Sequence, residues 1–295
     1  MIADALAWLI QRRPRPQAPP QASFADVPAR TVNVTIPTRH GDLPATVYQP
    51  ESSGAPVPVY VNFHGGGFVV RYPEQDDPLC RYLAANAGVA VVNVDYDVAP
   101  RHRFPVPVEE AYDAVRWAAG AGVGHGHGWD GARLCVGGQS AGGSLAAAVA
   151  RLALEQGGPD IALQVLHYPP LDLVTSERDK PMAVKPAFSV PMGDLFNVVY
   201  IPSPEARRDR LASPAWGQNA EGIAGIAPAL MITCEMDVLH DEGVAYAGKL
   251  AAVGALREHL DLAGVDHGYN MYVKDRALVE NGYALIAKHV IAATT

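Results

Sequence analysis

Cysteine is scarce in this chain of 295 residues, which has only Cys80, Cys135 and Cys234. The number is odd and no two cysteines form a CxxC pair, which excludes a disulfide framework and fits no zinc site. Cys135 and Cys234 lie in apolar runs, so we expect buried, reduced thiols. A reducing cytoplasm suits such cysteines.

Positive charge is also scarce. The 23 Lys and Arg residues are outnumbered by 31 Asp and Glu residues, which gives a formal net charge of −8. An acidic chain of this kind is a poor candidate for binding a phosphate backbone, so no nucleic-acid partner is expected. With 49% hydrophobic and 18% charged residues, the composition is that of an ordinary folded protein and excludes intrinsic disorder.

Long hydrophobic runs are missing as well. No run reaches the roughly 18 apolar residues that a membrane helix needs. The first residues, MIADALAWLIQRRPRPQ, place their basic residues after the apolar stretch, which is the opposite of a signal peptide. We therefore expect an amphipathic surface helix, with Ile2, Leu6, Leu9 and Ile10 on one side, and no stable membrane anchor.

What the sequence does contain is an alternation of strand and helix patterns. Two alternating runs separated by a turn predict an antiparallel hairpin, and five nearly continuous apolar runs predict strands covered on both faces. The hairpin runs are 31–36 and 43–48, and the buried strands are 57–63, 89–95, 133–137, 161–168 and 228–234. Helical patterns occur at 108–119, 141–156 and 241–253. Together they predict an α/β fold with a mostly parallel, doubly wound sheet.

Residues 171–226 interrupt this alternation. The segment is polar, irregular and rich in proline, with short helical patterns near 191–200 and 204–211. A connection this long is uncommon inside a compact domain, so the segment is predicted to form a cap or lid.

The run Gly138-Gln139-Ser140-Ala141-Gly142 joins a predicted strand to a predicted helix. A serine on such a sharp turn needs small neighbours. Its hydroxyl would project above the carboxyl edge of the sheet, where open α/β sheets bind ligands. A turn that only packs the helix against the strand is an equal alternative on this motif alone.

A second glycine-rich run, His64-Gly65-Gly66-Gly67-Phe68, follows the strand that ends at Phe63. Three glycines allow backbone N–H groups to approach a ligand, as stabilisation of an oxyanion requires. The alternatives are a phosphate cradle or a flexible turn. No Lys, Ser or Thr follows in the spacing of a phosphate-binding loop, which weakens the phosphate alternative.

A nucleophilic serine needs a base and a residue that orients the base. His267 lies in a short loop after the strand-like run 256–262, and Asp237 follows the strand 228–234. Ser140, Asp237 and His267 thus each follow a predicted strand, at one rim of one sheet. Glu235, two residues before Asp237, is the rival candidate for the acid.

Taken together, these motifs resemble those of the bacterial hormone-sensitive-lipase-like carboxylesterases, family IV of the α/β-hydrolase superfamily. The resemblance rests on HGGGF (64–68), DYDVAPRHRFP (95–105), GQSAGG (138–143), DVLHDEG (237–243) and DHGY (266–269). It implies the α/β-hydrolase fold with a small helical cap, and Ser140 as nucleophile, His267 as base and Asp237 as acid. The implied oxyanion hole consists of the backbone N–H groups of Gly66, Gly67 and Ala141. The implied supporting residues are His64, Gly65, Gly138 and Gly142.

The resemblance also implies a division of the chain. Cap segments at 1–30 and 171–215 would flank core segments at 31–170 and 216–295. The implied activity is that of a serine carboxylesterase for short- to medium-chain esters, working through an acyl-enzyme intermediate without a metal or cofactor. A small-molecule ester is then the expected partner, and a homodimer is allowed. The rival functions are hydrolysis of an amide or thioester, and a small-molecule receptor, although such receptors tend to lose the histidine.

Some residues depart from the family pattern. Gln139 replaces the usual Asp or Thr before the serine, and its amide donates as well as accepts hydrogen bonds. Arg101 and Arg103 replace more acidic or neutral residues, which changes pairing beneath the glycine-rich loop. Tyr269 stands where Phe is common, and we expect it to change packing only.

The remaining candidates have weaker support. His125 and His127 resemble metal ligands, but the sequence offers no third ligand nearby. Asp172 is expected to be a structural cap rather than a catalytic acid. Aromatic residues of the predicted cap that would suit an acyl pocket are Trp8, Phe188 and Phe196.

Overall fold

A single eight-stranded sheet organises the computed structural model, which describes residues 2–15, 17–51, 55–120, 128–181 and 190–295. The strand order is β1-β2-β4-β3-β5-β6-β7-β8. β2 pairs antiparallel with β1 and with β4, and all other pairs are parallel. The strands are β1 (Arg30–Thr38), β2 (Gly41–Gln49), β3 (Val57–Phe63), β4 (Ala90–Val94), β5 (Trp129–Gln139), β6 (Leu163–His167), β7 (Ala229–Cys234) and β8 (Leu256–Leu262). The predicted hairpin and mostly parallel sheet are confirmed.

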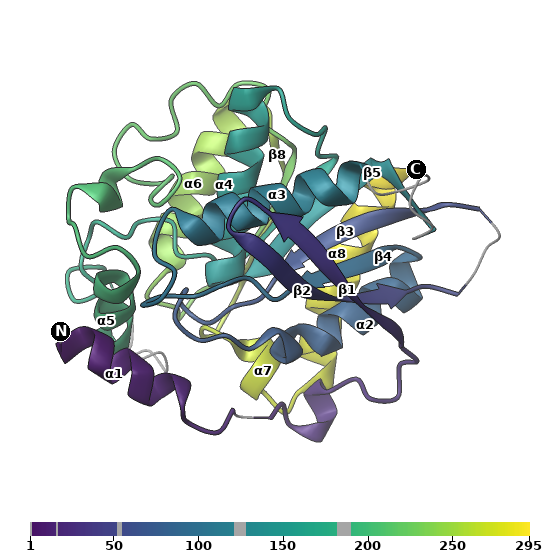
Figure 1. The fold of residues 1–295 in the computed structure, drawn as a ribbon, viewed down its shortest axis with the longest axis horizontal. Helices are drawn as coiled ribbons and strands as arrows, with labels where there is room; N and C mark the ends of the chain where they lie inside the picture. Colours follow the sequence, from purple (N-terminus) through teal and green to yellow (C-terminus); the bar gives the residue numbers. More distant parts are fainter. Residues whose placement is uncertain (1, 16, 52–54, 121–127, 182–189) are drawn as a thin grey trace.

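Helices cover both faces of this sheet (Figure 1). One face carries the three predicted helices, α3 (Val106–Gly120), α4 (Ala141–Gln156) and α6 (His240–Ala252). The other face carries α2 (Asp77–Ala87) and α8 (Arg276–Thr294), which were not predicted. Their sequences explain this, because α2 is short and begins with Asp-Pro, and residues 281–282 of α8 are Asn-Gly, a pair with low helix propensity.

The continuous apolar runs are explained by burial on both sides of the sheet. On β3, Val59 and Val61 belong to the core beneath α3 and α4, whereas Tyr60 between them belongs to the core beneath α2 and α8. Full burial of one such side chain contributes roughly 1.5–3 kcal/mol. Cys135 and Cys234 are buried and free, as expected, and so is Cys80.

The irregular segment between β6 and β7 contributes α5 (Val190–Tyr200), which packs against α1 (Ile2–Gln11) at one edge of the molecule (Figure 1). The second helix predicted there, near residues 204–211, is longer than the element that forms. Only a 3-10 turn, η3 (Ala206–Arg208), forms, and Pro204 and Pro214 bracket it. Other short elements are η1 (Pro20–Ala22), η2 (Pro73–Asp76) and α7 (Tyr269–Tyr272). None of the helices formed by the described residues has the length and apolar character to cross a bilayer.

Candidate functional site

Ser140 occupies the turn between β5 and α4. Its backbone has φ 52° and ψ −126°, a conformation that costs free energy for a residue with a side chain. The backbone N–H of Ser140 donates to the carbonyl of His167 at 2.8 Å, which holds the turn in place. A Cβ atom on Gly142 would overlap the carbonyl oxygen of Phe63, so the small residue predicted there is required.

His267 and Asp237 lie next to this serine, on the loops that follow β8 and β7. The His267 Nε2 atom is 3.0 Å from the Ser140 Oγ atom, and its Nδ1 atom is 2.7 Å from Asp237 Oδ2. The other oxygen of Asp237 accepts a hydrogen bond from the backbone N–H of Leu239 at 3.0 Å. Three residues far apart in the sequence therefore form one continuous chain of hydrogen bonds.

The electrostatics of His267 reflect two opposing effects. Burial disfavours the charged imidazolium and by itself would lower the pKa of His267. The Asp237 carboxylate outweighs burial through its charge and its hydrogen bond, so the pKa of His267 is raised above its ordinary value. The ring therefore binds a proton more readily than a free imidazole does.

Glu235, the rival candidate for the acid, has a different partner. Its carboxylate accepts a hydrogen bond from the backbone N–H of Gly264 at 2.6 Å. This contact shapes the loop that precedes His267, whereas Asp237 is the residue in contact with the imidazole. Sequence spacing could not separate the two acids, because both follow β7 within three residues.

The glycine-rich run 64–68 forms a fixed loop beside Ser140. The Gly66 carbonyl accepts from the backbone N–H groups of Val69 and Val70, at 3.1 and 2.8 Å. His64 stacks on Tyr96 with ring centroids 4.2 Å apart, and its Nδ1 atom is 2.6 Å from the Gly65 carbonyl oxygen. Burial lowers the pKa of His64 to about 4, so its ring stays neutral at neutral pH and donates through Nδ1.

Gly67 lies where this loop meets the α5 helix. Its φ is +59°, a left-handed conformation that favours glycine, and a Cβ atom would overlap the ring of Phe196. Ala141 lies opposite, at the first position of α4, where backbone N–H groups have no partner within a helix. Ala141 directly follows the serine, so its N–H group lies at the start of α4 beside Ser140.

Gln139 is the centre of a buried network beneath the serine. Its amide nitrogen donates to Asp76 Oδ1 at 2.6 Å, and its oxygen accepts from Tyr168 at 2.7 Å and from Asn270 at 2.6 Å. Burial raises the pKa of Asp76 to about 8. The aspartate that is usual at position 139 could accept hydrogen bonds but not donate one. Gln139 does donate one, and the buried Asp76 carboxyl group accepts it.

A cavity of about 860 Å³ opens onto Ser140 and His267. Its walls come from the glycine-rich loop, from the N-terminal segment and from the segment between β6 and β7. The lining residues include Ile10, Arg13, Gly66, Gly67, Glu177, Met192, Phe196, Asn197, Leu239, Met271 and Tyr272. Of the predicted pocket aromatics, Phe196 lines this cavity, Trp8 is exposed elsewhere, and Phe188 lies outside the described residues.

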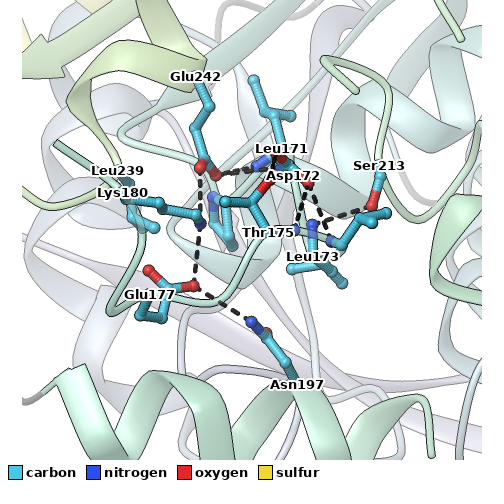
Figure 2. A network of polar contacts seen from close by, with 12 residues as sticks. Leu171, Asp172, Leu173, Thr175, Glu177, Lys180, Asn197, Ser213, Leu239 and Glu242 are labelled. Carbon is cyan, nitrogen blue, oxygen red and sulfur yellow. Dashed lines mark hydrogen bonds and ion pairs between the residues drawn. The ribbon is translucent and has the colours of Figure 1, made fainter. Parts of the chain in front are cut away.

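A buried ionic cluster fixes one wall of this cavity. Figure 2 shows Lys180 between two carboxylates, with its Nζ atom 2.9 Å from Glu177 Oε1 and 2.6 Å from Glu242 Oε2. Asn197 donates to Glu177 Oε1 at 3.1 Å, and the backbone N–H of Leu171 donates to Glu242 Oε1 at 2.6 Å. The cluster thus ties the segment after β6 to both α5 and α6.

The charges of this cluster depend on one another. Burial raises the pKa of Glu242 to about 7 and also raises the pKa of Glu177. Burial by itself would lower the pKa of Lys180, but the two carboxylates raise it, so the ammonium group stays charged. No sequence pattern indicated this cluster, since Glu177 and Lys180 lie in a polar segment that is typical of an exposed loop.

Other predicted residues have structural roles or lie outside the described part of the chain. Asp172 accepts from the backbone N–H groups of Val174 and Thr175, at 2.9 and 3.0 Å, as expected of a cap. His125 and His127 fall outside the described residues. The Tyr269 hydroxyl is 3.2 Å from His167 Nε2, so this departure also forms a polar contact.

Within the described residues, Asp97, His102 and Glu110 form the one group arranged closely enough to hold a metal ion. Arg71 already places its guanidinium 3.1 Å from Asp97, and His102 lies 3.3 Å from the same carboxylate. The positive charge that a metal would supply is therefore present in a side chain.

Comparison with known proteins agrees with this fold. Residues 60–271 match a protein family whose description is alpha/beta hydrolase fold. The chain is 36% identical over 252 residues to the carboxylic ester hydrolase LipN of Mycobacterium tuberculosis, across 80% of this chain and 63% of LipN. It is 35% identical over 258 residues to the ethyl acetate hydrolase of Pseudomonas putida, across 84% of this chain and 78% of that protein. The solved structure of a hyperthermophilic esterase from Pyrobaculum calidifontis matches with a TM-score of 0.83 and 31% identity, over 100% of this chain and 92% of that one.

Proposed function

The chain belongs to the bacterial hormone-sensitive-lipase-like carboxylesterases, family IV of the α/β-hydrolase superfamily. From this premise we propose that it hydrolyses short- to medium-chain carboxylic esters through an acyl-enzyme intermediate. The observation that carries the proposal is the chain of hydrogen bonds from Ser140 through His267 to Asp237.

In the first half of the proposed reaction, the Ser140 Oγ atom attacks the ester carbonyl carbon while His267 Nε2 takes the hydroxyl proton. Asp237 holds the imidazole with its Nδ1–H toward the carboxylate and stabilises the positive charge that forms. Collapse of the tetrahedral intermediate breaks the bond to the alcohol oxygen. His267 returns its proton to that oxygen, and the acyl group remains on Ser140.

The tetrahedral oxygen would be stabilised by the backbone N–H groups of Gly66, Gly67 and Ala141. These groups are fixed before the substrate arrives, by the loop contacts of Gly66 and by the start of α4. Preorganised donors of this kind each lower the barrier by roughly 3–4 kcal/mol. His64, Gly65, Gly138 and Gly142 support them by shaping the two turns.

The second half repeats the chemistry with water. His267 takes a proton from a water molecule, the hydroxide attacks the acyl carbon, and the bond to Ser140 Oγ breaks as His267 returns the proton to it. The carboxylic acid then leaves, and the enzyme is restored. Residues of this chain suffice for every proton transfer, so no metal or cofactor is invoked.

The predicted division of the chain suits this mechanism. We propose that residues 1–30 and 171–215 act as a cap over the core segments 31–170 and 216–295. Ile10 and Arg13 from the first cap segment, and Met192 and Phe196 from the second, line the cavity that opens onto Ser140. Walls of this kind suit an acyl chain of short to medium length. The free, buried cysteines fit action in the cytoplasm.

The proposal is tested by exchanging the serine. Ser140→Ala should abolish both turnover of p-nitrophenyl butyrate and covalent labelling by a fluorophosphonate probe. Ser144→Ala, one helical turn further along α4, is the matched control and should retain both. Unchanged labelling of Ser140→Ala would overturn the mechanism. Faster turnover of long-chain triglyceride emulsions than of soluble butyrate esters by the wild type would overturn the proposed acyl range.

The rival functions give different outcomes in the same assays. An amidase or thioesterase would turn over a matched amide or thioester faster than the ester. A receptor would bind a small ester without hydrolysing it. The presence of His267 within hydrogen-bond distance of Ser140 favours hydrolysis over binding alone.

A further inference from the structure

Helix α1 lies with its polar side chains toward the protein. Asp4 pairs with Arg103 at 2.7 Å, and the Gln11 amide donates to the carbonyls of Val69 and Ala99 at 2.7 and 2.9 Å. Ala7 on the same side is fully buried. The inward face of α1 therefore combines these polar contacts with Ala7 and the partly buried Ala3 and Ile10, which pack against the core.

The outward face of α1 is apolar. Ile2 is 82% exposed, Leu6 44% and Leu9 57%, and these residues are spaced to lie on one side of the helix. Trp8 is 45% exposed but lies away from this face, beside Gln11 and Arg71. Exposed apolar residues are common singly, but three on one face of a helix form a patch that indicates a binding surface.

Two arginines extend this patch toward the cavity. Arg12 and Arg13 follow α1 directly and both are exposed, and among the described residues neither forms an ion pair. Arg13 and Ile10 also line the cavity that opens onto Ser140, together with Tyr272, which is exposed on α7. The apolar face, the two positive charges and the cavity entrance therefore adjoin one another.

We propose that α1 docks this edge of the molecule onto an anionic lipid surface. Ile2, Leu6 and Leu9 would enter the boundary between headgroups and acyl chains, with the helix lying in the plane of the surface. Arg12 and Arg13 would lie at the level of the negatively charged headgroups. This is reversible binding to a surface, and α1 does not cross the membrane. Delivery of an ester from that surface into the cavity rests on the proposed function, but the docking itself does not.

A lipid surface fits this face better than a second copy of the chain. In a symmetric dimer the two copies would use the same patch, so both would bring Arg12 and Arg13 to one interface. The net charge of −8 on each copy would add further repulsion. Anionic headgroups neutralise the arginines instead, beside the apolar face of α1.

The experiment measures sedimentation of the whole protein with vesicles, without any ester present. One set of vesicles is phosphatidylcholine alone, and the other contains about one third phosphatidylglycerol. The wild type should bind the anionic vesicles more tightly, and added salt should weaken that preference. Leu6→Gln with Leu9→Gln should weaken binding to both vesicles about tenfold or more. Val244→Gln with Val253→Gln, which changes two exposed valines of α6 and its end, is the matched control.

A second pair of variants tests the charges. Arg12→Glu with Arg13→Glu should weaken binding to the anionic vesicles by about fivefold for each arginine removed, or more, and leave binding to phosphatidylcholine unchanged. Arg30→Glu with Arg257→Glu, on the two edge strands, makes the same change in net charge and should have little effect. Melting temperatures of all variants report whether they fold.

Three results would overturn the proposal. One is failure of the wild type to sediment with anionic vesicles. Another is an equal effect of the leucine pair and the valine pair. The last is a dimer detected by light scattering that the leucine variant dissociates, since the face would then bind a second copy. Because no ester is present, each of these results leaves the proposed hydrolysis intact.

Discussion

The side-chain oxygen of Gln139 accepts a hydrogen bond from the Asn270 amide at 2.6 Å, which joins the residue before Ser140 to the segment just after His267. The same oxygen accepts from Tyr168, and the Gln139 nitrogen donates to Asp76. One side chain thus links the turn that carries the serine to the loop that carries the histidine.

Gln139→Leu should therefore lower both stability and turnover. The change keeps the approximate volume but leaves Asp76, Tyr168 and Asn270 without a shared partner, so we expect a loss of about 2–4 kcal/mol in the free energy of unfolding. Urea unfolding measures this, and the kinetic loss should appear in kcat more than in KM. Gln164→Leu is the control, because among the described residues the side chain of buried Gln164 makes one hydrogen bond, to the carbonyl of Ala227. Equal losses for the two variants would contradict the linking role.

The pH profile of the wild type should report His267. The imidazole must be neutral to accept the serine proton, so kcat/KM should rise with pH as His267 loses its proton. Since the neighbouring Asp237 raises the pKa of His267 above the ordinary value of 6.5, the midpoint of this rise should lie above 6.5. Rates of p-nitrophenyl butyrate hydrolysis between pH 5 and 9 measure it. A flat profile would remove His267 as the base.

Asp237→Asn should separate the two acids that follow β7. We expect kcat to fall by about ten-thousand-fold, because the amide no longer holds the imidazole in the required tautomer. The rise of the pH profile should also move to lower pH, since the negative charge that raises the pKa of His267 is gone. Glu235→Gln is the matched control and should retain activity within about tenfold. The reverse order of the two variants would make Glu235 the acid.

Lys180→Met should destabilise the protein strongly. It leaves the buried carboxylates of Glu177 and Glu242 without their cation, which costs about 3–5 kcal/mol. Carboxyl groups whose pKa values are raised by burial contribute less stability as the pH rises, so the loss should be larger at pH 8 than at pH 5. Urea unfolding at both values measures it. Lys288→Met, whose side chain is exposed and 3.7 Å from Glu258, should change stability by less than about 1 kcal/mol.

Gly67→Ala should reduce activity more than stability. The new methyl group would push against the Phe196 ring and shift the loop that carries a proposed oxyanion donor, and kcat/KM should fall by about a hundredfold. Adding Phe196→Ala removes the obstruction and should restore part of the rate. Gly88→Ala, at a similar φ of +64° but with open space around it, controls for backbone strain alone. No further benefit from Phe196→Ala would exclude the collision as the cause.

The positions of Ser140, Asp237 and His267 were predictable because each follows a run that forms a strand. The runs before Ser140 and Asp237 are apolar, and the run before His267 is the strand-like segment 256–262. The carboxyl ends of β5, β7 and β8 lie along one edge of the sheet, so sequence order was enough to bring the three residues together. The hairpin and helices α3, α4 and α6 were predictable because their hydrophobic patterns depend only on residues near one another in the sequence.

Partners that depend on tertiary packing were not predictable. Asp76 and Asn270 lie on elements that the sequence pattern did not separate from loops, and only the fold shows that both face Gln139. The exposure of the Leu6 and Leu9 side chains was also not predictable. Their spacing indicates an amphipathic helix, but it does not say which face packs against the protein.

Much of the cavity wall comes from α1, the residues just after it and α5, which lie outside the sheet. Ile10 lies in the last turn of α1 and Arg13 just after it, and Met192 and Phe196 belong to α5. Ser140, Asp237 and His267 lie on the loops that follow strands of the sheet. In the proposed mechanism, substrate range and chemistry therefore depend on different stretches of the chain. A combinatorial library confined to the first group can retune which esters enter without disturbing the strand pairing on which bond cleavage relies.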